Sequence, residues 1–409
     1  MKICVLTHTF PRTPKDTTAA FMKEFSDGLV QAGANVVVLT PFDKSFNRPK
    51  HLFKIKTYKY VWPDSLHILG YSQTMENDLG LKKRAFLLLP LFIFFGTLAL
   101  YKTVKREKID LVNVHWILPN GLIALFVFWL TKVPYAITIP GTDAYLAYRY
   151  KLFGWVARLI AKNSAGLVSN SSLLLNRITD LGIGKKKTAV YSYPVNVSVY
   201  RPLKEGIIDY RRRHGISKDD LVLLAVGRFV YKKGYAYLIK AIPHVLKRFP
   251  KTKLVMGGDG GLRRQLEELA ATLGITDNVL FIGNIDRDSI VYYYNMADVM
   301  VSPSVIDRNG NVDGGPVVSF ESMACGKPQV VTDILGVADF IENGINGFKV
   351  PQKKTRELAK AIIKILESRS LRDKMGRVNR KLVLDKFGTK KVGEYYLNFF
   401  KEVLYSKQQ

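Results

Sequence analysis

Two carboxylates set eight positions apart are the clearest sign of chemistry in this 409-residue sequence. Asp313 comes directly before a Gly-Gly-Pro turn, and Glu321 follows in a run of small residues that favours a short helix. Backbone amides at such a turn and the positive end of a helix suit an anionic ligand, while two carboxylates can accept hydrogen bonds from sugar hydroxyls. The pattern predicts a nucleotide-sugar pocket. The alternative is that Glu321 only occupies a helix start.

A pair of cations follows a predicted strand at the start of the second half. The segment AVGRFVYKKG places Arg228 after the strand and Lys233 five residues later, before a helix. Arginine can bind a diphosphate with two hydrogen bonds, and lysine acts as a mobile point charge. Two solvated surface cations on a basic protein are the alternative, but the spacing after a glycine favours the ligand role.

The order of these segments resembles that of the GT4-type retaining glycosyltransferases, also called glycosyltransferase group 1. That family has a two-domain GT-B fold and usually carries a glutamate where this chain has Asp313, which is one methylene shorter. The resemblance implies as catalytic candidates His115, Asp313 and Glu321. It implies as donor-binding candidates Arg228, Lys233, Gly258, Ile285, Gly314, Gly315, Pro316 and Val317.

The resemblance also implies a role for each group. Asp313 and the two glycine amides after it would orient the sugar ring, and Glu321 would bind the ribose hydroxyls. Arg228 and Lys233 would bind the donor diphosphate and stabilise the nucleotide as it leaves. The family needs no metal or other cofactor in its site, which agrees with the lack of an Asp-x-Asp motif at a clear strand end.

Two further segments are matched to the family. The glycine-rich loop MGGDGG, which contains Gly258, lets the backbone pass close to a ligand or a packed helix. In the family this loop borders the nucleotide, and residues 281–285, which end in Ile285, lie beside the base. Because glycine-rich strand ends are common, both assignments depend on the resemblance.

The first half offers a less specific site. His115 stands at a predicted strand end, where open parallel sheets place ligands, although a lone histidine is usually structural. In the family, a histidine here often lies near the reacting sugar or the acceptor. Relatives commonly have another histidine where this chain has Pro140, which leaves Asp143 as the polar contact. The first loop lacks the family's glycine pair and offers Thr18 instead.

Short apolar runs alternate with helical patterns along the whole chain, which predicts an α/β protein with parallel sheets covered by helices on both faces. The strands of the first series are residues 2–6, 35–39, 109–114, 135–139, 166–168 and 188–191. Those of the second series are residues 221–226, 253–256, 279–282, 299–302, 329–332 and 347–350. The two series predict two doubly wound, Rossmann-like domains.

Domain limits follow from the linker that separates the two series. Residues 193–203 contain Pro194 and Pro202 and show no periodicity. We expect an N-terminal acceptor-binding domain over 1–195, a C-terminal domain that binds the nucleotide sugar over 196–385, and a last helix over 386–409. The resemblance implies that the two domains face a central cleft and that the last helix crosses back to the first domain.

The composition is that of a globular chain, with 47% hydrophobic residues and a formal net charge of +28. Such a charge attracts nucleic acid, anionic lipid or phosphorylated small molecules. No helix-turn-helix, zinc-ligand cluster or aromatic ribonucleoprotein-type motif is present, so we expect no nucleic-acid partner. Cys4 and Cys325 lie in separate apolar runs, and the first apolar run is too short for a secretory signal. These features indicate a reduced, cytoplasmic protein.

An uncharged segment over residues 85–101, AFLLLPLFIFFGTLALY, is flanked by Lys and Arg on both sides. It is at or below the lower length limit for a membrane-spanning helix and contains Pro90 and Gly96. One interpretation is a core helix. Because its phenylalanines and leucines exceed what one buried face requires, the other is an in-plane contact with an anionic membrane surface.

The leading hypothesis is therefore a hexosyltransferase. It would move a hexose with retention from a nucleotide-diphosphate sugar to a lipid-linked or polysaccharide acceptor, bound peripherally at the cytoplasmic membrane face. A sugar epimerase or glycan phosphorylase on the same fold remains an alternative, because fold does not fix function. A non-enzymatic polyanion-binding protein is the third interpretation, and it predicts salt-sensitive nucleic-acid binding without donor turnover.

Overall fold

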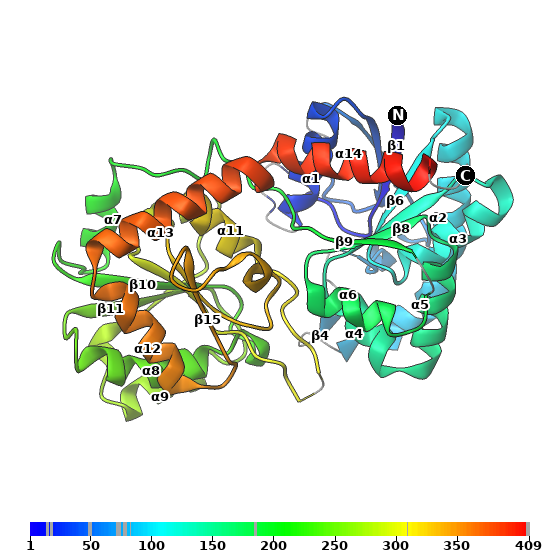
Figure 1. The fold of residues 1–409 in the computed structure, drawn as a ribbon. Coiled ribbons are helices and arrows are strands. Elements are labelled where there is room, and N and C mark those ends of the chain that lie inside the picture. Colours follow the sequence, from blue (N-terminus) through cyan, green and yellow to red (C-terminus); the bar gives the residue numbers. More distant parts are fainter. Residues whose placement is uncertain are drawn as a thin grey trace. The chain divides into compact units, whose positions relative to one another are not determined.

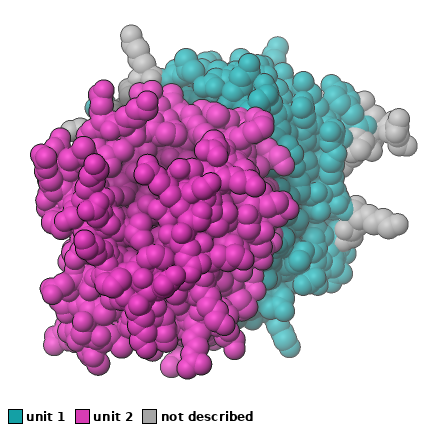
Figure 2. Space-filling model, turned by 60° about the vertical axis from the view of Figure 1, so that its left-hand side comes forward, with its two compact units in different colours: residues 1–194, 389–409 teal, residues 195–388 magenta. Residues whose placement is uncertain are grey.

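The computed structural model describes the chain except for residues 14, 15, 17, 18, 48–50, 71–74, 77–79, 82, 184, 185, 309 and 406–409. The chain forms two compact units, which Figure 2 colours separately. Unit 1 contains Met1–Pro194 and Thr389–Gln409, and unit 2 contains Val195–Gly388. The domain limits expected after residues 195 and 385 fall beside these boundaries.

Unit 1 is built on a parallel sheet of seven strands in its described residues, in the order β3-β2-β1-β6-β7-β8-β9 (Figure 1). The strands are β1 (Lys2–Leu6), β2 (Asn35–Pro41), β3 (Lys54–Tyr58), β6 (Leu111–His115), β7 (Tyr135–Ile139), β8 (Gly166–Ser169) and β9 (Lys187–Val190). The central strands are apolar runs buried on both faces, as a parallel sheet covered by helices requires. A separate small antiparallel pair is formed by β4 (Met75–Glu76) and β5 (Gly80–Leu81).

The helices of unit 1 fall into two groups because its strand connections run outward from β1 and β6 in opposite directions. Right-handed crossovers then place helices on opposite faces of the sheet. The first group is α1 (Ala20–Gln31) with α14 (Thr389–Tyr405), which pack against each other. The second is α2 (Lys83–Glu107), α3 (Asn120–Thr131), α4 (Thr142–Arg149), α5 (Lys151–Asn163) and α6 (Ser172–Thr179), with a 3₁₀ turn at Asp64–Leu66 before it.

Unit 2 repeats the doubly wound pattern, with six parallel strands in its described residues in the order β12-β11-β10-β13-β14-β15. The strands are β10 (Leu221–Val226), β11 (Thr252–Gly257), β12 (Val279–Gly283), β13 (Val299–Ser302), β14 (Gln329–Thr332) and β15 (Gly347–Val350). The helices are α7 (Ile207–Arg213), α8 (Tyr235–Leu246), α9 (Arg263–Thr272), α10 (Ile290–Met296), α11 (Val317–Ala324), α12 (Thr355–Leu366) and α13 (Arg369–Leu382). Shorter turns lie at Tyr231–Lys233 (η2), Thr276–Asn278 (η3), Gly336–Phe340 (η4) and Val383–Phe387 (η5).

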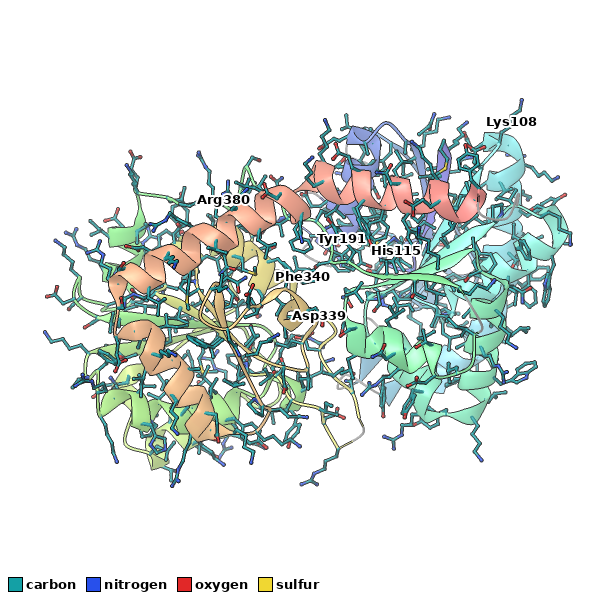
Figure 3. All side chains as sticks on the ribbon, viewed as in Figure 1. Lys108, His115, Tyr191, Asp339, Phe340 and Arg380 are labelled. Carbon is teal, nitrogen blue, oxygen red and sulfur yellow. The ribbon has the colours of Figure 1, made fainter. Side chains whose placement is uncertain are left out.

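Each unit has its own core. In unit 2, Leu238 and Ile242 of α8 and Ile362 of α12 pack against the sheet and are fully buried. These residues recur at helical spacing in the sequence, and burial of such a stripe is what holds an amphipathic helix on a sheet. Arg380 of α13 (Figure 3) donates hydrogen bonds to the carbonyls of Tyr200 at 2.8 Å and Ala324 at 2.9 Å. It thereby ties the first residues of unit 2 to α11 and α13.

Besides the small pair of β4 and β5, the described residues add to the main sheet of unit 1 a strand that the sequence analysis leaves out. Strand β3 alternates Lys54 and Lys56 with smaller or apolar residues and lies at the sheet edge. Both lysines form ion pairs with Glu107 of α2, at 3.2 and 2.8 Å. An edge strand with charged side chains carries little of the apolar signal that identifies buried strands, and it resists pairing with other chains.

The uncharged segment over 85–101 lies within α2. In the described residues, one stretch, Leu87–Glu107, is long and apolar enough by composition to cross a membrane. Phe92, Leu100 and Val104 of this stretch are buried inside unit 1. One side of α2 therefore belongs to the core of unit 1, as the first interpretation of this segment expects.

Candidate active site

The carboxyl ends of β10 and β13 frame a small cavity in unit 2. These two strands are neighbours, and the sheet is wound outward from them in opposite directions. Open parallel sheets bind ligands at such a switch point. The cavity has a volume of about 10 Å³ and is lined by Val226, Lys233, Tyr235, Val301, Ser302, Pro303, Ser304, Asp313 and Pro316. Three of the predicted residues, Lys233, Asp313 and Pro316, are thus brought together.

Lys233 and Asp313 form an ion pair at the cavity. The Lys233 Nζ lies 2.5 Å from Asp313 Oδ2, and the two side chains are 16% and 18% exposed. Burial opposes ionisation of Asp313, but the charge and hydrogen bond of Lys233, with smaller contributions from the charges of Lys232 and Arg228, hold the pKa of this carboxyl below its usual value. Asp313 is therefore an anion near neutral pH, and it can only accept hydrogen bonds.

The turn that carries Lys233 is held by close backbone contacts. Gly234 follows it with φ at +68°, and a Cβ there would overlap the carbonyl oxygen of Pro303. The amide of Val305 donates to the carbonyl of Lys232 at 2.8 Å. A Cβ at Gly227 would lie 3.1 Å from Lys233 Cε. The glycines leave room for the lysine, and the turn is fixed to the loop after β13. Arg228, which follows β10, is exposed at the same end of the sheet.

The backbone at position 258 requires a glycine. Its φ is +132°, its amide donates to the carbonyl of Gly283 at 2.7 Å, and a Cβ there would overlap the carbonyl oxygen of Gly227. The loops after β10, β11 and β12 therefore touch backbone to backbone. Ile285 packs beside them, because its Cδ1 occupies the space that a Cβ on Gly257 would need. Both predicted residues lie at the carboxyl edge of the sheet.

The Gly-Gly-Pro turn leads directly into α11. Gly314 is buried, Gly315 is half-buried, and Pro316 precedes the first helical residue, Val317. The first amides of a helix have no partner within the helix, so they can bind an anion. The hydroxyl of Ser319 on α11 lies 3.0 Å from that of Ser302, which ties the helix start to the end of β13.

Glu321 of α11 is held by a tyrosine that the sequence analysis missed. The hydroxyl of Tyr294 donates to Glu321 Oε2 at 2.7 Å. Burial, followed by the negative charge of Glu321, raises the pKa of Tyr294 well above its usual value, so this hydroxyl keeps its proton. The ring of Tyr200 packs against that of Tyr294 with centroids 6.0 Å apart. Helical spacing in the sequence could have identified Tyr294 as buried, because Ile290, Val291 and Tyr294 share the buried side of α10.

In unit 1, His115 ends β6 and is fully buried (Figure 3). Its Nδ1 lies 2.8 Å from the hydroxyl of Tyr193, and Phe25 packs edge-on at 4.7 Å. Burial, with a smaller contribution from His8, lowers the pKa of His115 to about 3. The imidazole is therefore neutral at physiological pH, and its Nε2 is buried without a hydrogen-bond partner among the described residues.

His8 is a second histidine at the same place, and the sequence analysis missed it. It lies two residues beyond β1, which neighbours β6 at the switch point of the unit 1 sheet. Its ring packs on Trp116 with centroids 4.4 Å apart, and Asn120 Nδ2 lies 3.2 Å from its Nδ1. Burial lowers its pKa to about 4. Its position just past the first strand was a usable signal.

Two predicted residues of unit 1 have no described side chains. Thr18 lies outside the described residues, and so does the side chain of Asp143, although its backbone belongs to α4. In the part of the chain that is described, no group of three or more His, Cys, Asp or Glu side chains is placed to hold a metal ion. The expected absence of a metal from the site stays a prediction.

Known proteins match both halves of the chain. Residues 207–382 match the family Glycosyl transferases group 1, and residues 18–199 match Glycosyltransferase Family 4. The uncharacterized glycosyltransferase MJ1607 of Methanocaldococcus jannaschii is 25% identical, over 98% of each chain. The alpha-monoglucosyldiacylglycerol synthase of Streptococcus pneumoniae is 24% identical over 58% of this chain and 55% of its own.

A solved structure matches the fold. Anabaena HepE in complex with UDP aligns with a TM-score of 0.74 at 18% identity, over 98% of this chain and 100% of its own. At this identity the likeness concerns the fold alone. Together with the two parallel, doubly wound sheets, it confirms the expected GT-B fold class.

Proposed function

Because this chain belongs to the group 1 glycosyltransferases of the GT4 type, we propose that it transfers a hexose from a nucleotide-diphosphate sugar with retention of configuration. The acceptor is a lipid-linked or polysaccharide glycan at the cytoplasmic face of the membrane. The observation that carries the donor half of this proposal is the ion pair of Lys233 and Asp313 at the switch point of the unit 2 sheet.

The donor diphosphate binds where cations meet the start of α11. Lys233 and the exposed Arg228 supply positive charge, and the first amides of α11 supply hydrogen-bond donors. When the diphosphate attracts the ammonium of Lys233, Asp313 is left with an ionised oxygen that accepts hydrogen bonds from the sugar hydroxyls. The ion pair thus couples phosphate binding to sugar orientation. The complex of HepE with UDP supports UDP-sugars as the first donors to test.

In the transfer step, the bond between the sugar C1 and the diphosphate oxygen breaks, and the nucleotide leaves with the electron pair. A bond forms between C1 and the acceptor oxygen, whose proton is released. Lys233, Arg228 and the α11 amides stabilise the negative charge that develops on the leaving diphosphate. Tyr294 keeps Glu321 in one orientation, in which the carboxylate binds the ribose hydroxyls.

The acceptor half of the proposal has separate support. The name of the Streptococcus pneumoniae relative states a diacylglycerol glycolipid as product, which supports a lipid-linked acceptor. The partly exposed apolar helix α2 supports a peripheral location at the membrane.

The test is nucleotide release by the purified protein from UDP-, GDP- and ADP-sugars, with and without a membrane lipid extract. Glu321→Ala should abolish release, and Glu357→Ala, an exposed glutamate on α12, should leave it unchanged. Release from one donor that rises with lipid supports the proposal. Equal release by both variants, or no release from any donor, contradicts it.

A further inference from the structure

Three helices of unit 1 pack in a row on one face of its sheet. A Cβ on Gly96 of α2 would clash with the side chain of Ile123 of α3, at 2.6 Å from its Cδ1. A Cβ on Gly121 of α3 would lie 2.7 Å from Ile160 of α5. These close approaches at glycine fix α2, α3 and α5 side by side within unit 1 (Figure 1). Their outward sides therefore form one surface.

The outward side of α2 is apolar along most of its length. Its exposed large side chains recur three or four positions apart and are Leu87, Leu91, Phe94, Leu98 and Tyr101, with Phe95 beside them. A stripe at this spacing ordinarily faces a partner, since it places one side of a helix in contact. The opposite side of α2 is the one buried in unit 1. The exposed stripe is therefore a second apolar side, and no other element in the described part of unit 1 covers it.

The neighbouring helices extend the same surface. On α3, Phe126, Trp129 and Leu130 are exposed, and Leu130 is 67% exposed. On α5, Leu152 is 70% and Trp155 is 63% exposed. Two of the chain's four tryptophans thus lie on the outward side of these helices. Tryptophan is the residue most typical of the boundary between membrane and water. We call the outward side of α2, α3 and α5 the apolar face.

The charged residues of the three helices are nearly all cations. By sequence, α2 carries five cations and α5 three, while the three helices contain one acidic residue, Glu107. Glu107 is paired with lysines of the unit 1 sheet. Lys102 and Lys105 of α2 and Arg158 of α5 are exposed. An apolar surface bordered by cations is complementary to anionic lipid, and it disfavours a second copy of itself because the like charges repel.

We propose that the apolar face docks unit 1 onto an anionic lipid bilayer, with α2, α3 and α5 lying in the plane of the membrane surface. The inference deepens the membrane location of the proposed function and rests on it, but it is tested without turnover. Crossing the bilayer is excluded for α2, because Phe92, Leu100 and Val104 belong to the core of unit 1. The exposed stripe enters the headgroup boundary, and the cations contact lipid phosphates.

The first experiment measures partition of the full chain onto phosphatidylcholine vesicles with and without phosphatidylglycerol, at low and high salt. The variant Trp129→Ser with Leu130→Ser should bind anionic vesicles roughly tenfold more weakly than wild type. The matched control is Ile208→Ser with Leu384→Ser in unit 2, whose side chains are similarly exposed at 64% and 42%. This control should bind like wild type.

A second pair of variants tests the charges. Lys102→Gln with Lys105→Gln should weaken binding to anionic vesicles by about twenty-fivefold, since each cation near such a surface contributes about fivefold. Lys240→Gln with Lys247→Gln, which removes two exposed cations of unit 2, should have little effect. Acyl-chain-brominated lipid should quench tryptophan fluorescence, and Trp129→Phe should reduce that quenching.

Equal vesicle binding by all variants, or binding without quenching, overturns the proposal. It is also overturned if the Trp129 and Leu130 changes turn a dimer into a monomer without changing vesicle binding. Donor release distinguishes the two proposals. If the Trp129/Leu130 and Lys102/Lys105 variants release nucleotide and bind vesicles like wild type, the membrane-docking proposal is rejected and the proposed function is not. If the wild-type protein releases no nucleotide but the variants bind vesicles more weakly as expected, the proposed function is rejected and membrane docking is not.

Discussion

Lys233 and Asp313 were assigned to different parts of the donor from their sequence contexts, one to the diphosphate and one to the sugar. The structure joins them in one ion pair 80 residues apart in the chain. Two partly buried opposite charges stabilise each other, and removal of one leaves the other without compensation. The pair therefore keeps both charges compensated in the folded chain.

Lys233→Ala should lower kcat by about 10²–10³, because it removes one donor to the developing charge of the leaving group. It should also raise the pKa of Asp313 by removing its principal cation. The measurement is steady-state nucleotide release over a range of pH, with Lys240→Ala as a control. A Lys233→Ala enzyme with wild-type kcat would exclude the lysine from the donor site.

Tyr294→Phe tests whether Glu321 needs its tyrosine partner. The change should raise KM for the donor about tenfold, because a hydrogen bond to a charged group contributes about 1.5 kcal/mol. It should leave kcat nearly unchanged if Glu321 binds ribose rather than the reacting sugar. Tyr293→Phe on the same helix removes a hydroxyl that contacts His214 at 2.9 Å and is the control. Equal KM values for the two variants would contradict the assignment.

At the scale of elements, glycines set how closely loops and helices approach. The sequence analysis linked Gly258 to a ligand or to a packed helix, and the structure places it against the backbone of Gly227 in another loop. The distinction depends on which loop lies beside the glycine. That neighbour, Gly227, follows a different strand, so the sequence around Gly258 does not identify it. The part of Gly258 in donor binding stays a prediction.

Gly258→Ala should destabilise unit 2 by about 2 kcal/mol, because it combines a left-handed φ with overlap against the backbone of Gly227. Gly261→Ala in the same loop meets nothing within 4 Å and should change stability by less than about 0.5 kcal/mol. Urea unfolding followed by circular dichroism measures both. Similar midpoints for the two variants would show that the loops can separate at little cost.

Two of the histidines whose pKa values are lowered, His8 and His115, lie just past β1 and at the end of β6. The pKa of His115 falls from 6.5 to about 3, so between these values the unfolded chain binds more protons than the folded chain. Its contribution to stability is complete above pH 6.5 and is lost as the pH falls toward 3. Unit 1 should therefore weaken in mild acid.

His115→Gln should reduce the slope of stability against pH in this window by up to about 1.4 kcal/mol per pH unit. The measurement is urea unfolding of wild type and variant at several pH values, followed by tryptophan fluorescence. The carboxylates contribute equally to both proteins, so the difference isolates the histidine. Parallel pH profiles would mean that His115 is protonated in the folded protein.

At the scale of the whole molecule, the chain leaves unit 1 after Pro194 and returns to it at Thr389. Unit 1 is therefore built from both ends of the sequence. Helix α14 packs against α1 within unit 1 (Figure 1). It buries Tyr396, Phe399 and Phe400. The four tryptophans of the chain all lie in unit 1, so tryptophan fluorescence reports on that unit alone.

Phe400→Ala should destabilise unit 1 by about 3–5 kcal/mol, because the ring is fully buried and its loss leaves a cavity. Tyr405→Ala on the same helix should have little effect, since this side chain is 66% exposed. Chemical unfolding followed by tryptophan fluorescence measures both. An unchanged fluorescence midpoint for Phe400→Ala would show that unit 1 does not require α14.

The twelve strands expected from apolar runs are all present, and three residues that line the unit 2 cavity, Lys233, Asp313 and Pro316, were named from motifs. Apolar periodicity, turn residues and the spacing of acidic residues are properties of residues that are close in the chain. The pairing of Lys233 with Asp313, the contact of Tyr294 with Glu321 and the burial of His115 against Tyr193 join residues 80, 27 and 78 positions apart. Only the folded chain brings such residues together. The same holds for α2, whose two apolar sides look alike in sequence until α3 and the sheet cover one and leave the other exposed.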